Sequence, residues 1–157
     1  MMKQLIRVGF LAAAVFLAGY VSTVNAQTVT GSIANGSVTR GTAARATVYL
    51  GIPAGLHVNS NRPNGEYAIA TTVKASSTGA KVGGFTYPRG KNRKFEFSEK
   101  PLNVYEGRVP ITFTVTVPST FRGRVVTVNV TVHYQACTNE VCYPPKNKTI
   151  TLTAKVN

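Results

Sequence analysis

Three segments of the chain alternate apolar side chains with threonine or other polar side chains, one position after the next. They span residues 111–117, 126–134 and 149–156. A period of two, with β-branched residues on both faces, predicts half-buried antiparallel strands. Weaker runs of the same kind cover residues 29–33, 46–50, 68–74 and 94–97.

Turn-forming residues separate these runs. The clusters are Asn35-Gly36, Pro53-Ala54-Gly55, Pro63-Asn64-Gly65, Gly83-Gly84, Pro88-Arg89-Gly90 and Arg122-Gly123. After residue 26, no long stretch has the apolar spacing of an amphipathic helix. About seven or eight short strands with frequent turns predict an all-β fold, an immunoglobulin-like antiparallel β-sandwich. We expect it to form a single domain over residues 27–157.

The N-terminal segment has the pattern of an export signal. Lys3 and Arg7 precede an apolar run over residues 8–21, and the small residues Val24 and Ala26 follow it. This arrangement predicts a signal peptide over residues 1–26, cut after Ala26. A membrane anchor is the alternative, although the apolar run is shorter than the ~20 residues that span a bilayer. We therefore expect a soluble exported protein, periplasmic or otherwise outside the cytoplasm, with no stable membrane span after cleavage.

The strong excess of basic over acidic residues argues against carboxylate-based sites and indicates which classes of partner could bind. Lysine and arginine number 18 and acidic residues 5, all of them glutamate, so the formal net charge is +13. So few acidic residues argue against a hydrolytic site with two paired carboxylates. They also argue against a Ca²⁺ or Mg²⁺ site made of carboxylate ligands. A basic cluster over residues 89–94 is typical of nucleic-acid surfaces, but the export signal argues against a nucleic-acid partner. Acidic partners or anionic envelope surfaces suit the charge better.

Two cysteines, Cys137 and Cys142, lie in the segment YQACTNEVCYPP. In an exported chain they predict one disulfide, with Cα atoms about 4.4–6.8 Å apart. A loop this short gains little stability from closure, so the bond suits either redox work at an exposed tip or a structural hairpin staple. If the preceding strand continues unbroken, Cys137 points away from the core.

The two histidines offer weaker candidates. His133 shares a strand face with Cys137 but lies about 13 Å along the strand, too far for a Cys–His pair, so we expect a surface side chain. His57 follows a turn, and a structural role is favoured over one beside a substrate. A zinc site of His57, His133, Cys137 and Cys142 matches no common zinc-binding spacing. We predict no metal and no cofactor.

Two segments resemble a known family. The cysteine segment at residues 134–145 and GLHVNSNRP at residues 55–63 are similar to the N-terminal periplasmic domain family of the thiol:disulfide interchange protein DsbD, also named the disulfide bond corrector domain. The resemblance covers most of residues 31–156. It implies an immunoglobulin-like fold whose two cysteines cycle between dithiol and disulfide. Such a domain passes electrons from a membrane-embedded thiol reductase to oxidised, exported thioredoxin-fold proteins.

The resemblance also implies residue roles. Cys142 matches the cysteine that joins the partner, and Cys137 matches the one that resolves the mixed disulfide. The family's cap loop corresponds to Phe97, Ser98, Glu99, Lys100, Pro101 and Leu102, although the letters differ. Full-length members carry a membrane domain and a thioredoxin-like domain, so we expect the electron donor to act in trans. An exported immunoglobulin-like binding or adhesion module with a structural disulfide is the alternative function.

Overall fold

Two sheets form the body of the molecule in the computed structural model, which describes residues 26–157. The signal peptide predicted for residues 1–26 lies almost wholly outside the described residues. The first sheet has the order β1-β3-β9-β6, with β1 (Thr28–Ile33), β3 (Ala43–Gly51), β9 (Arg108–Thr116) and β6 (Lys81–Thr86). The second has the order β2-β12-β10-β5, with β2 (Ser37–Val38), β12 (Lys146–Val156), β10 (Val125–Tyr134) and β5 (Thr72–Ser76).

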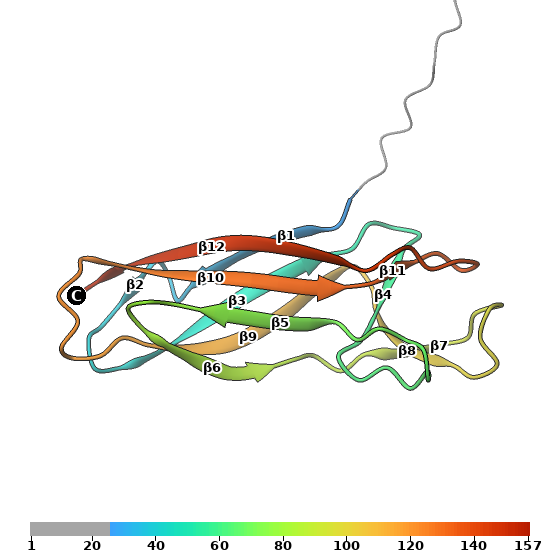
Figure 1. Ribbon diagram of the computed structural model, residues 1–157, viewed down its shortest axis with the longest axis horizontal. Coiled ribbons are helices and arrows are strands. Elements are labelled where there is room, and N and C mark those ends of the chain that lie inside the picture. The colour runs from blue at the N-terminus through green and yellow to red at the C-terminus, as the bar shows by residue number, and fades with distance from the viewer. Residues whose placement is uncertain (1–25) are drawn as a thin grey trace, which may run out of the picture.

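A third, smaller sheet lies at the end of the molecule opposite the C-terminus (Figure 1). Its order is β11-β4-β8-β7, with β11 (Ala136–Cys137), β4 (His57–Asn59), β8 (Leu102–Tyr105) and β7 (Lys91–Arg93). All pairings in the three sheets are antiparallel except the short parallel one between β2 and β12. We call this third sheet the end sheet.

The alternating pattern of the long strands explains why the two large sheets pack together. Along β10, every second side chain from Val126 to Val132 is fully buried, and the residues between them face outward. Strand β9 alternates in the same way, with Ile111 and Phe113 in the same apolar cluster as the β10 valines. Burying these two apolar faces against each other supplies the main stabilisation of the sandwich.

The predicted fold class is confirmed, since the described residues form an all-β, immunoglobulin-like antiparallel sandwich. The long strands lie where the sequence pattern places them. Among residues 26–157, no helix is long and apolar enough to cross a membrane.

Three local predictions are wrong. Gly83-Gly84 is not a turn but an irregularity inside β6, where the register against β9 shifts between Gly83 and Thr86. Gly84 has a φ of +66°, a conformation that glycine adopts without strain. Residues 94–97 form a loop after β7 rather than a strand, and only the last part of the run 68–74 belongs to β5.

Candidate active site at the disulfide

The strand that carries Cys137 changes sheets before it reaches the cysteine. β10 ends at Tyr134, and after Gln135 the chain continues as β11, where Ala136 and Cys137 pair with Val58 and His57 of β4. Ala136 still packs on the sandwich core, so Cys137 lies on the opposite face, as expected. The assumption of an unbroken strand is wrong, however, and so is the expected exposure: Cys137 is 0% exposed.

The end sheet buries residues on both of its faces. All three residues of β4 are buried, although a half-buried strand would alternate. Val58 and Tyr105 face the sandwich core, whereas Val104 belongs to a separate small cluster with Phe95 and Leu102. The loop between β7 and β8 supplies this second cover, which accounts for the burial of Cys137.

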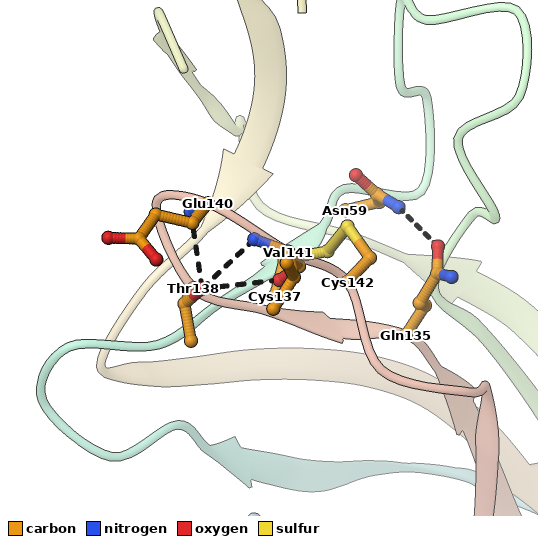
Figure 2. Close-up of a disulfide and its surroundings, with 7 residues drawn as sticks. All are labelled: Asn59, Gln135, Cys137, Thr138, Glu140, Val141 and Cys142. Carbon is orange, nitrogen blue, oxygen red and sulfur yellow. Dashed lines mark hydrogen bonds between the residues drawn. A yellow bond between two sulfur atoms is a disulfide. The ribbon is translucent and has the colours of Figure 1, made fainter. Parts of the chain in front are cut away.

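Cys137 and Cys142 form the predicted disulfide, with an S–S distance of 2.01 Å (Figure 2). Their Cα atoms are 4.0 Å apart, closer than the expected range. The two residues form an antiparallel bridge. On either side of it, the Thr138 N–H donates to the Val141 carbonyl and the Tyr143 N–H to the Ala136 carbonyl, both at 2.8 Å. The cysteines thus occupy a non-hydrogen-bonded pair, where Cα atoms approach most closely.

The loop between the cysteines is ordered by one threonine side chain. The Thr138 hydroxyl oxygen accepts hydrogen bonds from the N–H groups of Glu140 at 3.2 Å and Val141 at 3.1 Å (Figure 2). After the loop, Pro144 and Pro145 stay outside the ladder, and β12 begins at Lys146. The loop is therefore a tight hairpin that holds Cys142 in a fixed place beside Cys137.

The two halves of the disulfide differ in their access to solvent. Cys137 is fully buried, whereas Cys142 is exposed. Cys142 also lies in the wall of a cavity of about 250 Å³. Cys142 is therefore the accessible residue of the pair, and Cys137 is the shielded one.

Residues from three segments line this cavity beside Cys142. Asn59 and Gln135 form part of the wall, and the Asn59 amide donates to the Gln135 side-chain oxygen at 3.3 Å (Figure 2). The other lining residues are Gly65, Glu66, Tyr67, Ala68, Phe97, Ser98 and Leu102. The structure thus brings half of the predicted cap residues, Phe97, Ser98 and Leu102, to the cavity. Glu99, Lys100 and Pro101 are exposed and lie outside its wall.

His57 lies next to the disulfide, in register with Cys137 across the β4–β11 pair. It is only 3% exposed. Its ring stacks on Phe95, with centroids 4.0 Å apart, and Phe95 stacks on Phe97 at 5.3 Å. Sequence reasoning favoured a structural role for His57 over one beside a substrate, and it did not connect Phe95 with the cysteines. The available signal was the position of His57 inside the GLHVNSNRP segment, which the fold brings beside the cysteine segment.

The other histidine lies apart from this site. His133 is on β10, and its Nδ1 atom is 2.8 Å from the Asn147 side-chain oxygen. In the part of the chain that the structure describes, no three His, Cys, Asp or Glu side chains gather in a way that could hold a metal ion.

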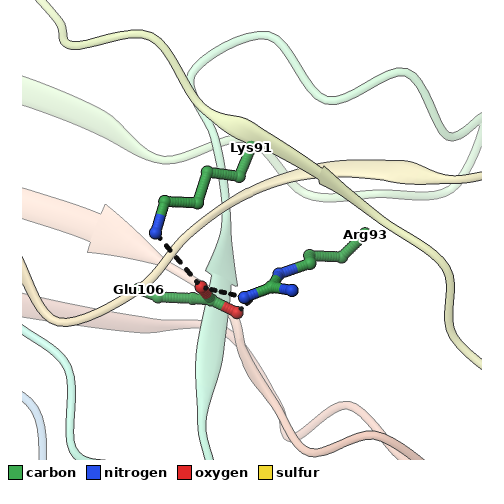
Figure 3. A network of polar contacts seen from close by, with 3 residues as sticks. All are labelled: Lys91, Arg93 and Glu106. Atoms are coloured by element: carbon green, nitrogen blue, oxygen red, sulfur yellow. Dashed lines mark hydrogen bonds and ion pairs between the residues drawn. The ribbon is translucent and has the colours of Figure 1, made fainter.

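A small ion-pair network borders the end sheet. Glu106 accepts hydrogen bonds from Arg93 at 3.0 and 3.2 Å, and Lys91 lies 3.7 Å from the same carboxylate (Figure 3). The hydrogen bond from Arg93 holds the pKa of Glu106 below its ordinary value. Burial lowers the pKa of His57, and the negative charge of Glu106 partly opposes that effect.

We expect Glu106→Gln to cause a small, pH-dependent loss of stability. Because the pKa of Glu106 is lowered in the folded protein, its charge stabilises the fold above the ordinary value of 4.5. That contribution disappears as the pH falls through the lowered pKa, so the variant and the wild type should converge in stability below it. Urea unfolding across this pH range measures the difference. A difference in stability that does not shrink as the pH falls below 4.5 would contradict this account.

Comparison with known proteins identifies a matching family model and a related protein. Residues 26–154 match the family model "Thiol:disulfide interchange protein DsbD, N-terminal". The chain is 25% identical over 97 residues to the thiol:disulfide interchange protein DsbD of Actinobacillus pleuropneumoniae serotype 5b (strain L20). That match covers 62% of this chain and 15% of the relative, so the chain corresponds to a minor part of the relative's length.

One solved structure shares the fold at low identity, and a second is similar to a lesser degree. The N-terminal periplasmic domain of ScsB from Proteus mirabilis matches with a TM-score of 0.53 and 12% identity, over 79% of this chain and 44% of that one. The Neisseria meningitidis DsbD N-terminal domain in the reduced form matches with a TM-score of 0.47 and 17% identity, over 80% and 87%. The family match extends over nearly all described residues and includes both cysteines. This chain belongs to the DsbD N-terminal domain family.

Proposed function

We propose that this protein is an exported thiol–disulfide exchange protein that passes electrons through Cys137 and Cys142. One observation carries the proposal: the exposed Cys142 is bonded to the fully buried Cys137. In this proposal, the accessible Cys142 is the point at which a partner attacks or is attacked. The buried Cys137 is protected from partners and is left to resolve the mixed disulfide. Closing so short a loop stabilises the fold little, which leaves exchange chemistry as the better use of the bond.

The proposed reaction has two steps. In the reduced protein, the Cys142 thiolate attacks an oxidised partner's disulfide, forms a mixed disulfide and releases one partner thiolate. Cys137 then attacks the Cys142 sulfur, restores the internal disulfide and releases the second partner thiolate. The partner gains two electrons and the protein loses two. A reductase resets the pair by the reverse exchange.

The surroundings of Cys142 support a protein partner. Large apolar side chains are exposed around it: Tyr67 is 89% exposed, Val141 55% and Tyr143 46%. Exposed apolar groups clustered at one place mark interaction surfaces. Phe97, at 41% exposed, belongs to the same surface and lies in the cavity wall. In this proposal, the loop over residues 97–102 caps Cys142 between encounters, as the family resemblance implies.

The proposed partners follow from the family relation. They are a membrane-embedded thiol reductase as electron donor and oxidised thioredoxin-fold proteins as acceptors. The proposed location is the periplasm, reached by means of a signal peptide at residues 1–26 that leaves one domain over residues 27–157. A partner with an acidic face would suit the strong net positive charge of this chain.

The reduction potential tests this function. We expect the purified protein to equilibrate between dithiol and disulfide in glutathione buffers, with a potential above about −300 mV. Thiol alkylation followed by mass spectrometry gives the reduced fraction at each buffer ratio, with Cys137→Ser/Cys142→Ser as the unreactive control. A potential far below that value would assign the bond to a structural role and favour a binding module.

A further inference from the structure

We infer that His57 accepts the proton of the Cys137 thiol when Cys137 attacks the mixed disulfide. This inference deepens the proposed function and rests on it. It adds a residue outside the cysteine pair to the chemistry of the resolving step.

The placement of His57 follows from strand pairing. His57 and Cys137 stand directly opposite each other in the antiparallel β4–β11 pair, so their side chains share one face of the end sheet. Residues paired in this way have Cβ atoms about 4.5–5.5 Å apart, within reach of side-chain contact. Cys142 continues the row, because it pairs with Cys137 on the other side. His57, Cys137 and Cys142 are thus three neighbours across one face.

The imidazole has a free position for a proton. The Nε2 atom of His57 is buried and has no hydrogen-bond partner. A buried polar atom without a partner is costly, and native proteins keep few of them unless they serve a function. The stack on Phe95 holds the ring in place without using either ring nitrogen.

Cys137 needs such an acceptor. The thiolate is the nucleophile in exchange, and burial disfavours its formation. The reduced Cys137 side chain would sit in a fully buried position between β4 and the loop that bears Cys142. A neutral base opposite Cys137 on the paired strand allows the thiol to react without first becoming a buried, unpaired anion.

The charged groups around His57 are compatible with a neutral imidazole at pH 7. Burial lowers its pKa, and Glu106 acts in the opposite direction. Glu106 is itself paired with Arg93 of β7 and lies near Lys91. Other charged groups on neighbouring segments are Lys94 and Glu96 beside Phe95, the exposed Glu99 and Lys100 further along the same loop, Glu66 in the cavity wall and the exposed Glu140 in the cysteine loop.

The step balances as follows. The Cys137 S–H proton moves to His57 Nε2 as the Cys137 sulfur bonds to the Cys142 sulfur. The bond between Cys142 and the partner breaks, and the electron pair leaves with the partner sulfur as a thiolate. The imidazolium then returns its proton to the departing thiolate or to solvent. Cys137 and Cys142 end oxidised as a disulfide, the partner ends reduced, and His57 is neutral again.

A small aromatic disulfide tests this step without a protein partner. One equivalent of 5,5′-dithiobis(2-nitrobenzoate) added to the reduced protein releases one thionitrobenzoate when Cys142 attacks and a second when Cys137 resolves. We expect His57→Phe, which keeps a ring to stack on Phe95, to slow the second release at least tenfold near pH 7. The gap between the two rates should narrow as the pH rises above the ordinary thiol range of about 8.5, because hydroxide can then take the proton in place of His57.

His133→Phe is the matched control, since it removes the other histidine, which lies on a different sheet. It should leave both phases unchanged. An identical pH profile for His57→Phe and wild type would overturn the inference. If the first release stays normal in that result, the proposed function still stands. A single release from the wild type would overturn the inference as well, because Cys137 would then not attack.

A second measurement covers the case in which His57→Phe does not fold. In the reduced wild type, proton NMR of the His57 ring should give an imidazole pKa that shifts in Cys137→Ala, because the ring then faces a methyl group in place of an ionisable thiol. Equal pKa values in the two proteins would overturn the inference.

Discussion

Cys137→Ala should trap a disulfide-linked complex with an oxidised, exported thioredoxin-fold isomerase, and Cys142→Ala should trap at least about tenfold less. In the first variant the accessible Cys142 remains, attacks the partner and finds no second thiol to resolve the bond. In the second, the remaining Cys137 is fully buried, so a partner disulfide cannot approach its sulfur in line. The difference in access, rather than a difference in chemistry between two thiols, produces the expected asymmetry.

Non-reducing electrophoresis of each variant mixed with the isomerase measures this trapping. The wild type provides the control, since it should form only a transient complex and release reduced partner. Equal trapping by both variants would remove the assignment of roles. No trapping by either, with a folded and oxidised partner, would favour the structural-disulfide module.

Phe113→Ala should lower the free energy of unfolding by about 3–5 kcal/mol. Phe113 is 2% exposed on β9 and packs against Phe85, with ring centroids 5.3 Å apart. Removing the ring leaves a cavity between the two large sheets, which the surrounding strands can fill only in part. Urea denaturation of the oxidised protein measures the change.

Thr114→Ala is the control for that experiment. Thr114 is the next residue of β9 and is exposed, so its loss should change stability by less than about 0.5 kcal/mol. Similar losses in both variants would mean that β9 does not present one face to the core. The reduction potential of Phe113→Ala, measured where the variant is folded, should match the wild type, because Phe113 is not among the residues that line the Cys142 cavity.

The sandwich could be predicted from sequence because the alternating pattern that identifies each strand lies within that strand. Valine alternates with polar residues along β10, and this pattern alone identifies a strand with one buried face. Twisted sheets with one apolar face have few ways to cover it, so the class of fold follows. The same reasoning failed at Gly83-Gly84, because a glycine pair has the same local preference in a turn and in a bulge.

The end sheet could not be predicted because it depends on pairing between short strands that lie far apart in the sequence. Its strands are very short, and all three residues of β4 are buried, so no period is visible in the sequence. The chain switches sheets at Gln135, yet the alternation continues through that residue. Only the pairing of β11 with β4 reveals that Cys137 lies beneath a second layer and beside His57.

The disulfide between the two cysteines could be predicted from the sequence, but the difference in exposure between them could be predicted only in part. Their spacing gave the disulfide, and the family resemblance implied that Cys142 is the cysteine that meets the partner. The burial of Cys137 depends on Phe95 and its neighbours in the loop after β7, where the sequence pattern predicted a strand.

The two backbone hydrogen bonds that flank the cysteine pair do not depend on the sulfur–sulfur bond. They join residue 138 to 141 and residue 143 to 136, so they can persist when the disulfide is reduced. The thiols then stay side by side, and the second meets a mixed disulfide at a very high effective molarity. In the proposed exchange, a mixed disulfide with a partner would therefore be short-lived, and free thiols in the surroundings would have little chance to intercept it. In the proposed function, the hairpin backbone thus favours fast and complete electron transfer to the partner over partial transfer.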